Sequence, residues 1–185
     1  MNNHKYLFFT LPTNEPLFTN FRTELFKRMK KEKLLPSAMH MFLAPSLEDW
    51  LKVTNPEYGH LLCCIKESHY LNITHIKPEN ICGIALINQF GHMKRVWSFD
   101  FTAFREHFSK AISMGQECLA WIFNNLPCDV LMGLTPKRNK HAWQIAQDVG
   151  FEIVCTVKDA CYMARKYKYE DGVLVIAKRE RFLRH

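Results

Sequence analysis

The pattern of apolar and polar residues predicts strands and helices that alternate along the chain. Apolar runs of strand length, bounded by turn-forming residues, occur at 6–11, 60–65, 81–87, 94–101, 128–134, 151–157 and 172–177. Apolar residues at helical spacing occupy 17–35, 109–126 and 139–149. Pro36 is expected to end the first helix. Ser46, with Asp49 three residues later, is close to a capping box and predicts a further short helix.

These elements follow one another in the order β-α-α-β-β-β-α-β-α-β-β. Helices and strands are mixed, which predicts an α/β (α+β) fold with a mixed central sheet that carries both parallel and antiparallel pairs. The strands in the middle of the chain predict an antiparallel meander, and crossover helices follow it. The sequence shows no repeat and no linker, so residues 1–185 are expected to form a single domain with one packed core.

Composition is typical of a globular protein. Apolar residues make up 48% of the chain and charged residues 23%, and no apolar run approaches the ~20 residues that a membrane helix needs. The N-terminus lacks the apolar core and cleavage site of a signal peptide. The seven cysteines form no C-x-x-C pair, and several lie in apolar segments. This favours buried, reduced thiols in a cytoplasmic protein over a disulfide framework.

The net charge of +7 favours an anionic partner, such as a phosphorylated cofactor, an acidic protein or a nucleic acid. Positive residues gather at 27–33 and 178–181. A solvated helix face explains the first cluster better than a nucleic-acid site, because no base-stacking or groove-reading motif accompanies it. The histidines lack metal-ligand spacing, so no metal site is expected. A Gly-x-Ser-x-Gly elbow and a P-loop are also missing from the sequence.

The most specific signal lies in the segment 128–157. A buried strand is followed by Pro136 and then by the pattern Asn139-x-x-Ala142-x-x-Ile145-Ala146-x-x-x-Gly150-Phe151. We expect Asn139 to cap a helix, Gly150 to end it with a positive φ, and Phe151 to enter the core. Together with the element order, this pattern resembles the Asn-x-x-Ala-x-x-hydrophobic-Tyr-x-x-x-Gly-Phe signature of the GCN5-related N-acetyltransferase (GNAT) family.

The resemblance implies an acyl-coenzyme A-dependent N-acetyltransferase. Such an enzyme transfers an acetyl group from acetyl-coenzyme A to an amine, which is a small molecule or a protein. The cofactor would lie where the strand 94–101 diverges from the strand 128–134. The cofactor-binding residues that the resemblance implies are Phe99, Phe101, Arg105, His107, Phe108, Ser109, Lys110, Asn139 and Ala142.

Two departures from the family pattern concern the chemistry. The family's pyrophosphate loop reads Gln/Arg-x-x-Gly-x-Gly/Ala, whereas the chain has Arg105-Glu-His-Phe-Ser-Lys110 without glycine. Helix N-terminal N–H groups and the nearby positive charges would have to replace it. Ala146 stands where many family members have a Tyr general acid. A thiolate leaving group with a pKa of ~8.5 needs little protonation at neutral pH.

Acetyl transfer also needs a group that takes the amine proton. Asp100 is the carboxylate nearest to the expected reaction centre, and His92 and Glu67 are weaker candidates. A solvent-facing residue at a strand end is the competing interpretation of Asp100. The departures from the family pattern are the reason to keep an alternative function, a non-catalytic binding or assembly protein on the same fold, including a phage-related one.

Two further expectations concern partners. Acceptor specificity is expected to come from the segments 12–51 and 158–171. An exposed strand, such as 172–177, is expected to be able to pair with a second copy of the chain and give a homodimer.

Overall fold

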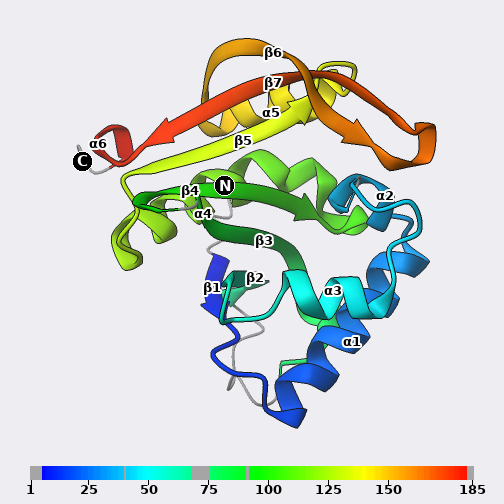
Figure 1. The fold of residues 1–185 in the computed structure, drawn as a ribbon. Coiled ribbons are helices and arrows are strands. Elements are labelled where there is room, and N and C mark those ends of the chain that lie inside the picture. Colours follow the sequence, from blue (N-terminus) through cyan, green and yellow to red (C-terminus); the bar gives the residue numbers. More distant parts are fainter. Residues whose placement is uncertain (1–5, 40, 68–75, 91, 183–185) are drawn as a thin grey trace.

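The computed structural model describes residues 6–39, 41–67, 76–90 and 92–182 of the chain. A seven-stranded sheet with the order β1-β2-β3-β4-β5-β7-β6 forms its centre (Figure 1). The strands are β1 (Tyr6–Thr10), β2 (Gly59–Lys66), β3 (Ile81–Phe90), β4 (Met93–Ala103), β5 (Val130–Pro136), β6 (Glu152–Met163) and β7 (Lys168–Lys178). β4 and β5 are parallel, and the other neighbouring pairs are antiparallel. The predicted mixed sheet with a central meander is therefore confirmed.

Helices cover both faces of this sheet (Figure 1). The α-helices are α1 (Pro16–Lys31), α2 (Leu35–Ala38), α3 (Leu47–Val53), α4 (Ala111–Asn125), α5 (Lys140–Val149) and α6 (Arg179–Phe182). Short 3-10 helices are η3 (Pro78–Asn80), η4 (Arg105–Lys110) and η5 (Ala164–Lys166). None of the helices in the described part of the chain is long and apolar enough to span a membrane.

Alternation along the strands divides the core between the two faces. On β2, Leu61 and Cys63 pack in a cluster with residues of α1 and α3, whereas Leu62 packs in a cluster with residues of α4. Trp50 of α3 is fully buried, and its indole N–H donates to the carbonyl of Arg22 in α1 at 2.8 Å. Burial on both faces explains why β2 reads as a continuous apolar run.

The N-terminal helices differ in part from the prediction. α1 ends at Lys31, earlier than predicted, and Lys33 then adopts a positive φ of 59°. Pro36 lies in the first turn of α2, where its missing N–H is tolerated, and so it does not end a helix. The short helix after Ser46 is confirmed with a full capping box. The Ser46 side chain accepts from the Asp49 N–H, and the Asp49 carboxylate accepts from the Ser46 N–H.

The C-terminal strands are longer than predicted. β6 and β7 form a hairpin that takes up most of the segment 158–171, with Tyr167 at φ 48° in the turn. The exposed edge is also not where it was expected. The segment 172–177 lies inside β7, which pairs with β5 on one side and β6 on the other. Its apolar character reflects burial, and β6 is the strand that ends the sheet.

The cysteines follow the prediction with one exception. Cys155 on β6 is exposed, because the strand that carries it lies at the edge of the sheet. The other cysteines are buried, and they are Cys63, Cys64, Cys82, Cys118, Cys128 and Cys161.

Candidate cofactor and active site

β4 and β5 separate after a short stretch of parallel pairing. The pairing runs from Val96 opposite Val130 to Ser98 opposite Met132 and ends there. β4 continues along β3 to Ala103, while β5 continues along β7. Beyond Ser98, neither strand has a strand partner across the gap among the described residues. Backbone N–H and C=O groups that face such a gap need another partner, which a ligand can provide.

A cavity of about 570 Å³ occupies this gap. Its walls come from β4, β5, α5 and the junction of η4 with α4, and Ser37 and Ala38 of α2 also line it. The volume falls within the roughly 300–1,000 Å³ of small-molecule and cofactor sites. The divergence of two parallel strands therefore produces a binding-site-sized hollow at the centre of the sheet.

The structure brings six of the ten predicted site residues to this cavity. They are Phe99, Asp100, Phe101, Phe108, Asn139 and Ala142. The rings of Phe99 and Phe101 stack with centroids 6.3 Å apart. The ring of Phe99 also packs against that of the buried Phe151, with centroids 5.5 Å apart. The aromatic wall is thus anchored in the core. His141 of α5 lines the cavity as well.

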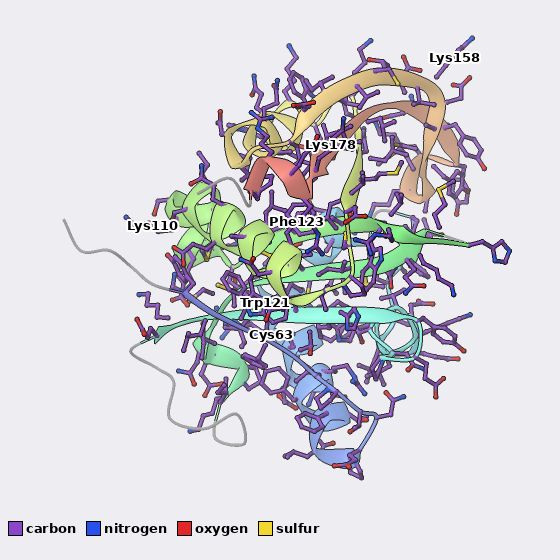
Figure 2. All side chains as sticks on the ribbon, turned by 90° about the vertical axis from the view of Figure 1, so that its left-hand side faces the viewer. Cys63, Lys110, Trp121, Phe123, Lys158 and Lys178 are labelled. Atoms are coloured by element: carbon purple, nitrogen blue, oxygen red, sulfur yellow. The ribbon has the colours of Figure 1, made fainter. Side chains whose placement is uncertain are left out.

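The other four predicted cofactor-binding residues, Arg105, His107, Ser109 and Lys110, are not among the residues that line the cavity. Arg105 bonds to Glu32 at the end of α1. Its Nε donates to the Glu32 carbonyl at 2.6 Å, and its N–H donates to the Glu32 carboxylate at 2.9 Å. Ser109 and Lys110 are exposed, and Figure 2 shows Lys110 at the outer margin of the molecule near the start of α4.

His107 is the fourth residue that does not line the cavity. Its Nε2 lies 3.1 Å from the Glu106 carboxylate. Burial lowers the pKa of His107, although the neighbouring Glu106 raises it. The chain coils here as a 3-10 helix over Arg105–Lys110, a segment that contains no glycine. The following helix α4 begins at Ala111, and no side chain of the described residues caps it.

Arg28 of α1 connects η4 with neighbouring segments of the chain through several hydrogen bonds. Its Nη1 donates to the carbonyls of Pro78 at 2.7 Å and Ile81 at 2.8 Å. Its Nε bonds to Glu32 at 2.8 Å, and its Nη2 bonds to Glu106 at 3.1 Å.

The guanidinium of Arg28 also lies 3.8 Å from the centre of the fully buried Phe104 ring. The sequence placed Arg28 in a solvated basic cluster. That interpretation holds for Lys27, whose side chain is 64% exposed, and fails for Arg28 at 15%. The only local signal was Glu32 one helical turn later.

The α5 side of the cavity follows the sequence pattern more closely. Gly150 has a φ of 125° and ends the helix, as predicted. The N–H of Phe151 donates to the Ala146 carbonyl at 2.9 Å, and Phe151 is buried. Asn139 occupies the cap position, but its side chain makes no capping hydrogen bond, which corrects that prediction. The Asn139 N–H instead closes a turn onto the Pro136 carbonyl at 2.8 Å.

Asp100 of β4 lines the cavity, as do Ser37 and Ala38 of α2. Successive side chains of β4 point to opposite faces, so Asp100 faces away from Phe99 and Phe101, which pack toward α4. Asp100 is exposed and also lines the cavity. Glu67 and His92 do not line it. Within the described ranges, no group of three or more His, Cys, Asp or Glu side chains is placed to hold a metal ion.

The parallel β4–β5 pair that diverges around a cavity, flanked by antiparallel strands and followed by α5, defines the fold of GCN5-related N-acetyltransferases. The predicted fold class is therefore confirmed. No family model matches the sequence, and no curated protein is significantly similar to it.

Solved structures resemble the chain over almost its whole length. The spermidine N-acetyltransferase of Vibrio cholerae in complex with CoA and spermine gives a TM-score of 0.65 at 14% identity, covering 96% of this chain and 98% of that one. A GNAT-family acetyltransferase of Bacillus anthracis gives a TM-score of 0.68 at 11% identity, also covering 96% of this chain and 98% of its own. At such identities the likeness establishes the fold, and function is argued from the site.

Proposed function

We propose that the protein is an acyl-coenzyme A-dependent N-acetyltransferase that transfers an acetyl group from acetyl-coenzyme A to an amine. The observation that carries this proposal is the cavity between the diverging strands β4 and β5, bounded by α5. The proposed partners are acetyl-coenzyme A, an amine acceptor that is a small molecule or a protein, and a second copy of the chain. We also propose a cytoplasmic location, which the seven unpaired cysteines support.

The residues of the cavity fit the long arm and the phosphates of coenzyme A. Phe99, Phe101 and Ala142 give apolar walls, and the strand edges beyond Ser98 offer backbone hydrogen-bonding groups. Ala111 begins α4 and lines the cavity, so the positive end of the helix faces the gap. Helix N-termini bind phosphate without help from glycine or basic side chains. The Asn139 side chain, which makes no capping bond, would add an amide at the rim.

The amine would attack the thioester carbon, the carbon–sulfur bond would break, and the thiolate would leave. Asp100, which lines the cavity, would take the proton from the amine. Backbone N–H groups of β4 beyond Ser98 would stabilise the charge that develops on the carbonyl oxygen. Ala146 offers no proton, which a thiolate leaving group with a pKa of ~8.5 does not require at neutral pH.

Calorimetric titration with acetyl-coenzyme A tests the proposal. An Ala142→Phe variant would fill the cavity and is expected to weaken binding at least ~tenfold. Gln144→Phe is its matched control, because Gln144 lies on the exposed side of the same helix. An Asp100→Asn variant is expected to bind the cofactor normally and to lose about a hundredfold in kcat. Polyamines head the acceptor panel, because the V. cholerae structure contains spermine.

The alternative is a non-catalytic binding or assembly protein on the same fold. The observation in its favour is that η4 has no glycine and that Arg105 bonds to α1. The structures described above are acetyltransferases and lend no support to a phage-related role. Absence of heat at millimolar acetyl-coenzyme A would overturn the enzyme proposal and favour this alternative.

A further inference from the structure

A cluster of positive charge lies where the β6–β7 hairpin meets the start of α5. Arg138 Nε lies 2.9 Å from the Glu170 carboxylate, and the Nζ atoms of Lys166 and Lys168 each lie 3.4 Å from it. The Glu170 side chain is 15% exposed, whereas the three cations are 46%, 47% and 56% exposed. The carboxylate offsets one of the three positive charges, and the excess faces solvent. Such a cluster attracts a further anion.

The cluster lies on the same face of the sheet as Asp100. On β7, Val173 packs in a cluster with residues of α4, so Gly172 and Glu170 belong to the opposite face. On β4, Phe99 packs toward α4, and Asp100 therefore also faces away from it. In the proposed reaction the amine approaches Asp100. The positive cluster is thus on the side of the acceptor and not on the side of the Phe99 wall.

Leu134 of β5 links the cavity to the cluster. It lines the cavity and is 37% exposed. A Cβ built on Gly172 would lie 2.7 Å from Leu134 Cδ1, so this side chain lies over Gly172. Glu170 is the next residue of β7 on that face, about 7 Å further along the strand. A molecule that leaves the cavity over Leu134 therefore reaches the cations that surround Glu170.

The span between Asp100 and the cluster sets the length of the acceptor. Asp100 lies two residues beyond the last β4–β5 pair, level with Leu134. Leu134 lies opposite Leu174, and Glu170 is four residues further toward the hairpin turn. Four residues of a strand span about 13 Å, and the divergence of β4 from β5 adds to this distance. A single amino acid is too short, whereas an extended peptide covers the span in about four residues or more.

The charges at the two ends of this span determine the charge of the acceptor. Among the described residues that line the cavity, Asp100 is the only Asp, Glu, Lys or Arg. A polyamine carries several ammonium groups along its length, and those beyond Asp100 would approach the three cations of the cluster. Because like charges repel, the site favours an acceptor with an ammonium group at one end and carboxylates at the other.

We propose that the acceptor is an acidic peptide. Its amine enters the cavity beside Asp100, and its carboxylates, about four or more residues away, bind Arg138, Lys166 and Lys168. This inference rests on the proposed acetyl transfer for the role of the amine, but the contact between the peptide and the cations does not need the coenzyme. The acceptor differs in charge from the spermine that the V. cholerae structure contains.

Matched peptides test the proposal on the full chain. Three labelled heptapeptides share a neutral N-terminal half, and their last three residues are all Glu, all Gln or all Lys. Fluorescence anisotropy is expected to show about tenfold tighter binding of the Glu peptide than of the Gln peptide, and the weakest binding for the Lys peptide. The preference is expected to shrink as salt is added. Equal affinities for the three peptides would overturn the proposal.

Removal of charge assigns the preference to the cluster. The double variant Lys166→Gln/Lys168→Gln is expected to lose most of the preference for the Glu peptide. The control is Lys158→Gln/Lys178→Gln, which removes the same charge from exposed positions of the same two strands, and Figure 2 shows Lys158 at the outer margin of the molecule. The control should keep the preference. If Lys166→Gln/Lys168→Gln keeps it as well, the cluster does not bind the peptide and the proposal is wrong.

Acetyl transfer separates this inference from the proposed function. With acetyl-coenzyme A, we expect the Glu peptide to be acetylated with a kcat/KM at least about tenfold above those of the Lys peptide and of spermine. Faster turnover of spermine would leave the acetyltransferase intact and overturn the acidic acceptor. Preferential binding of the Glu peptide without any acetyl transfer would overturn the proposed function and leave the contact between the cluster and the peptide in place.

Discussion

The α5 wall and the η4 wall of the cavity are held by interactions of different range. The α5 wall depends on neighbours in sequence, namely the turn at Pro136 and the positive φ of Gly150. The η4 wall depends on Arg28, which lies 78 residues from Glu106. The two ends of α5 are therefore set by local backbone preferences, although the helix also packs on α4 through Val149 and Gly115, whereas η4 is held by a charged network between distant segments. A variant that loosens one wall should leave the other intact, and this separates the two mechanisms.

Replacing Arg28 with Ala is expected to have the largest effect. The change leaves the carbonyls of Pro78 and Ile81 without their donor and removes the contact with Phe104. We expect a loss of about 3 kcal/mol in the free energy of unfolding, measured in urea. Lys27→Ala, one residue away and exposed, is the control and should change it by less than about 0.5 kcal/mol.

Hydrogen exchange locates the damage in the Arg28→Ala variant. Amides of residues 105–110 should exchange faster, and amides of α5 should keep their protection. Equal loosening of both walls would contradict the separation between them.

Gly150→Ala is expected to loosen the α5 wall. A φ of 125° is unfavourable for alanine, and the added Cβ would meet the Phe182 ring at 2.8 Å. We expect about 1–2 kcal/mol lower stability. Gln147→Ala, at an exposed position of the same helix, is the control and should change stability by about 0.5 kcal/mol or less. Here the α5 amides should lose protection while the η4 amides retain it, and the reverse pattern would count against local control of α5.

The same difference explains what the sequence could predict. Pro136, Gly150 and Phe151 act on their immediate neighbours, so the helix and its end were predictable. Arg105 was predicted to bind the cofactor, and in the structure its Nε donates to the Glu32 carbonyl, a contact that the sequence could not show because it gives a charge but not the direction of its side chain. Its partner Glu32 lies 73 residues away. Asn139 shows a second limit of prediction from sequence. Its residue type favours the N-cap position, but its side chain makes no capping hydrogen bond.

The edge of the sheet was misplaced for the same reason. The segments 151–157 and 172–177 are both short apolar runs, and nothing local says which one lies between two strands. The strand order is set by pairing between distant parts of the chain, and it buries 172–177 while exposing 152–159. Apolar composition thus marks a strand correctly and leaves its place in the sheet undetermined.

The Asn139→Ala variant tests whether the first residue of the α5 wall contributes to stability or to cofactor binding. Loss of a capping side chain usually costs about 1 kcal/mol. Because Asn139 makes no capping bond, we expect a change below about 0.5 kcal/mol in stability. Affinity for acetyl-coenzyme A is expected to fall about tenfold, since the side chain lines the cavity.

Lys140→Ala is the matched control for Asn139→Ala, because Lys140 is exposed and does not line the cavity. It should alter neither stability nor affinity. A stability loss near 1 kcal/mol in the Asn139 variant would show that the side chain caps the helix after all.

The smallest expected effect is a pH dependence confined to the η4 wall. Burial lowers the pKa of His107, and the nearby Lys66 and Arg28 act in the same direction against Glu106. The unfolded chain, with an ordinary pKa of about 6.5, therefore binds a proton more readily than the folded protein. The stability that neutral His107 contributes is present above about pH 6.5 and is lost as the pH falls below it.

We therefore expect the wild-type protein to lose more stability than His107→Gln between about pH 7.5 and 5.5, because glutamine cannot take up the proton. Urea unfolding of both proteins across this range measures the difference. Glutamine keeps a polar side chain of similar reach, so the comparison isolates the proton from the packing. If the free energy of unfolding changes with pH by the same amount in both proteins, protonation of His107 does not destabilise the η4 wall. That result would contradict the prediction.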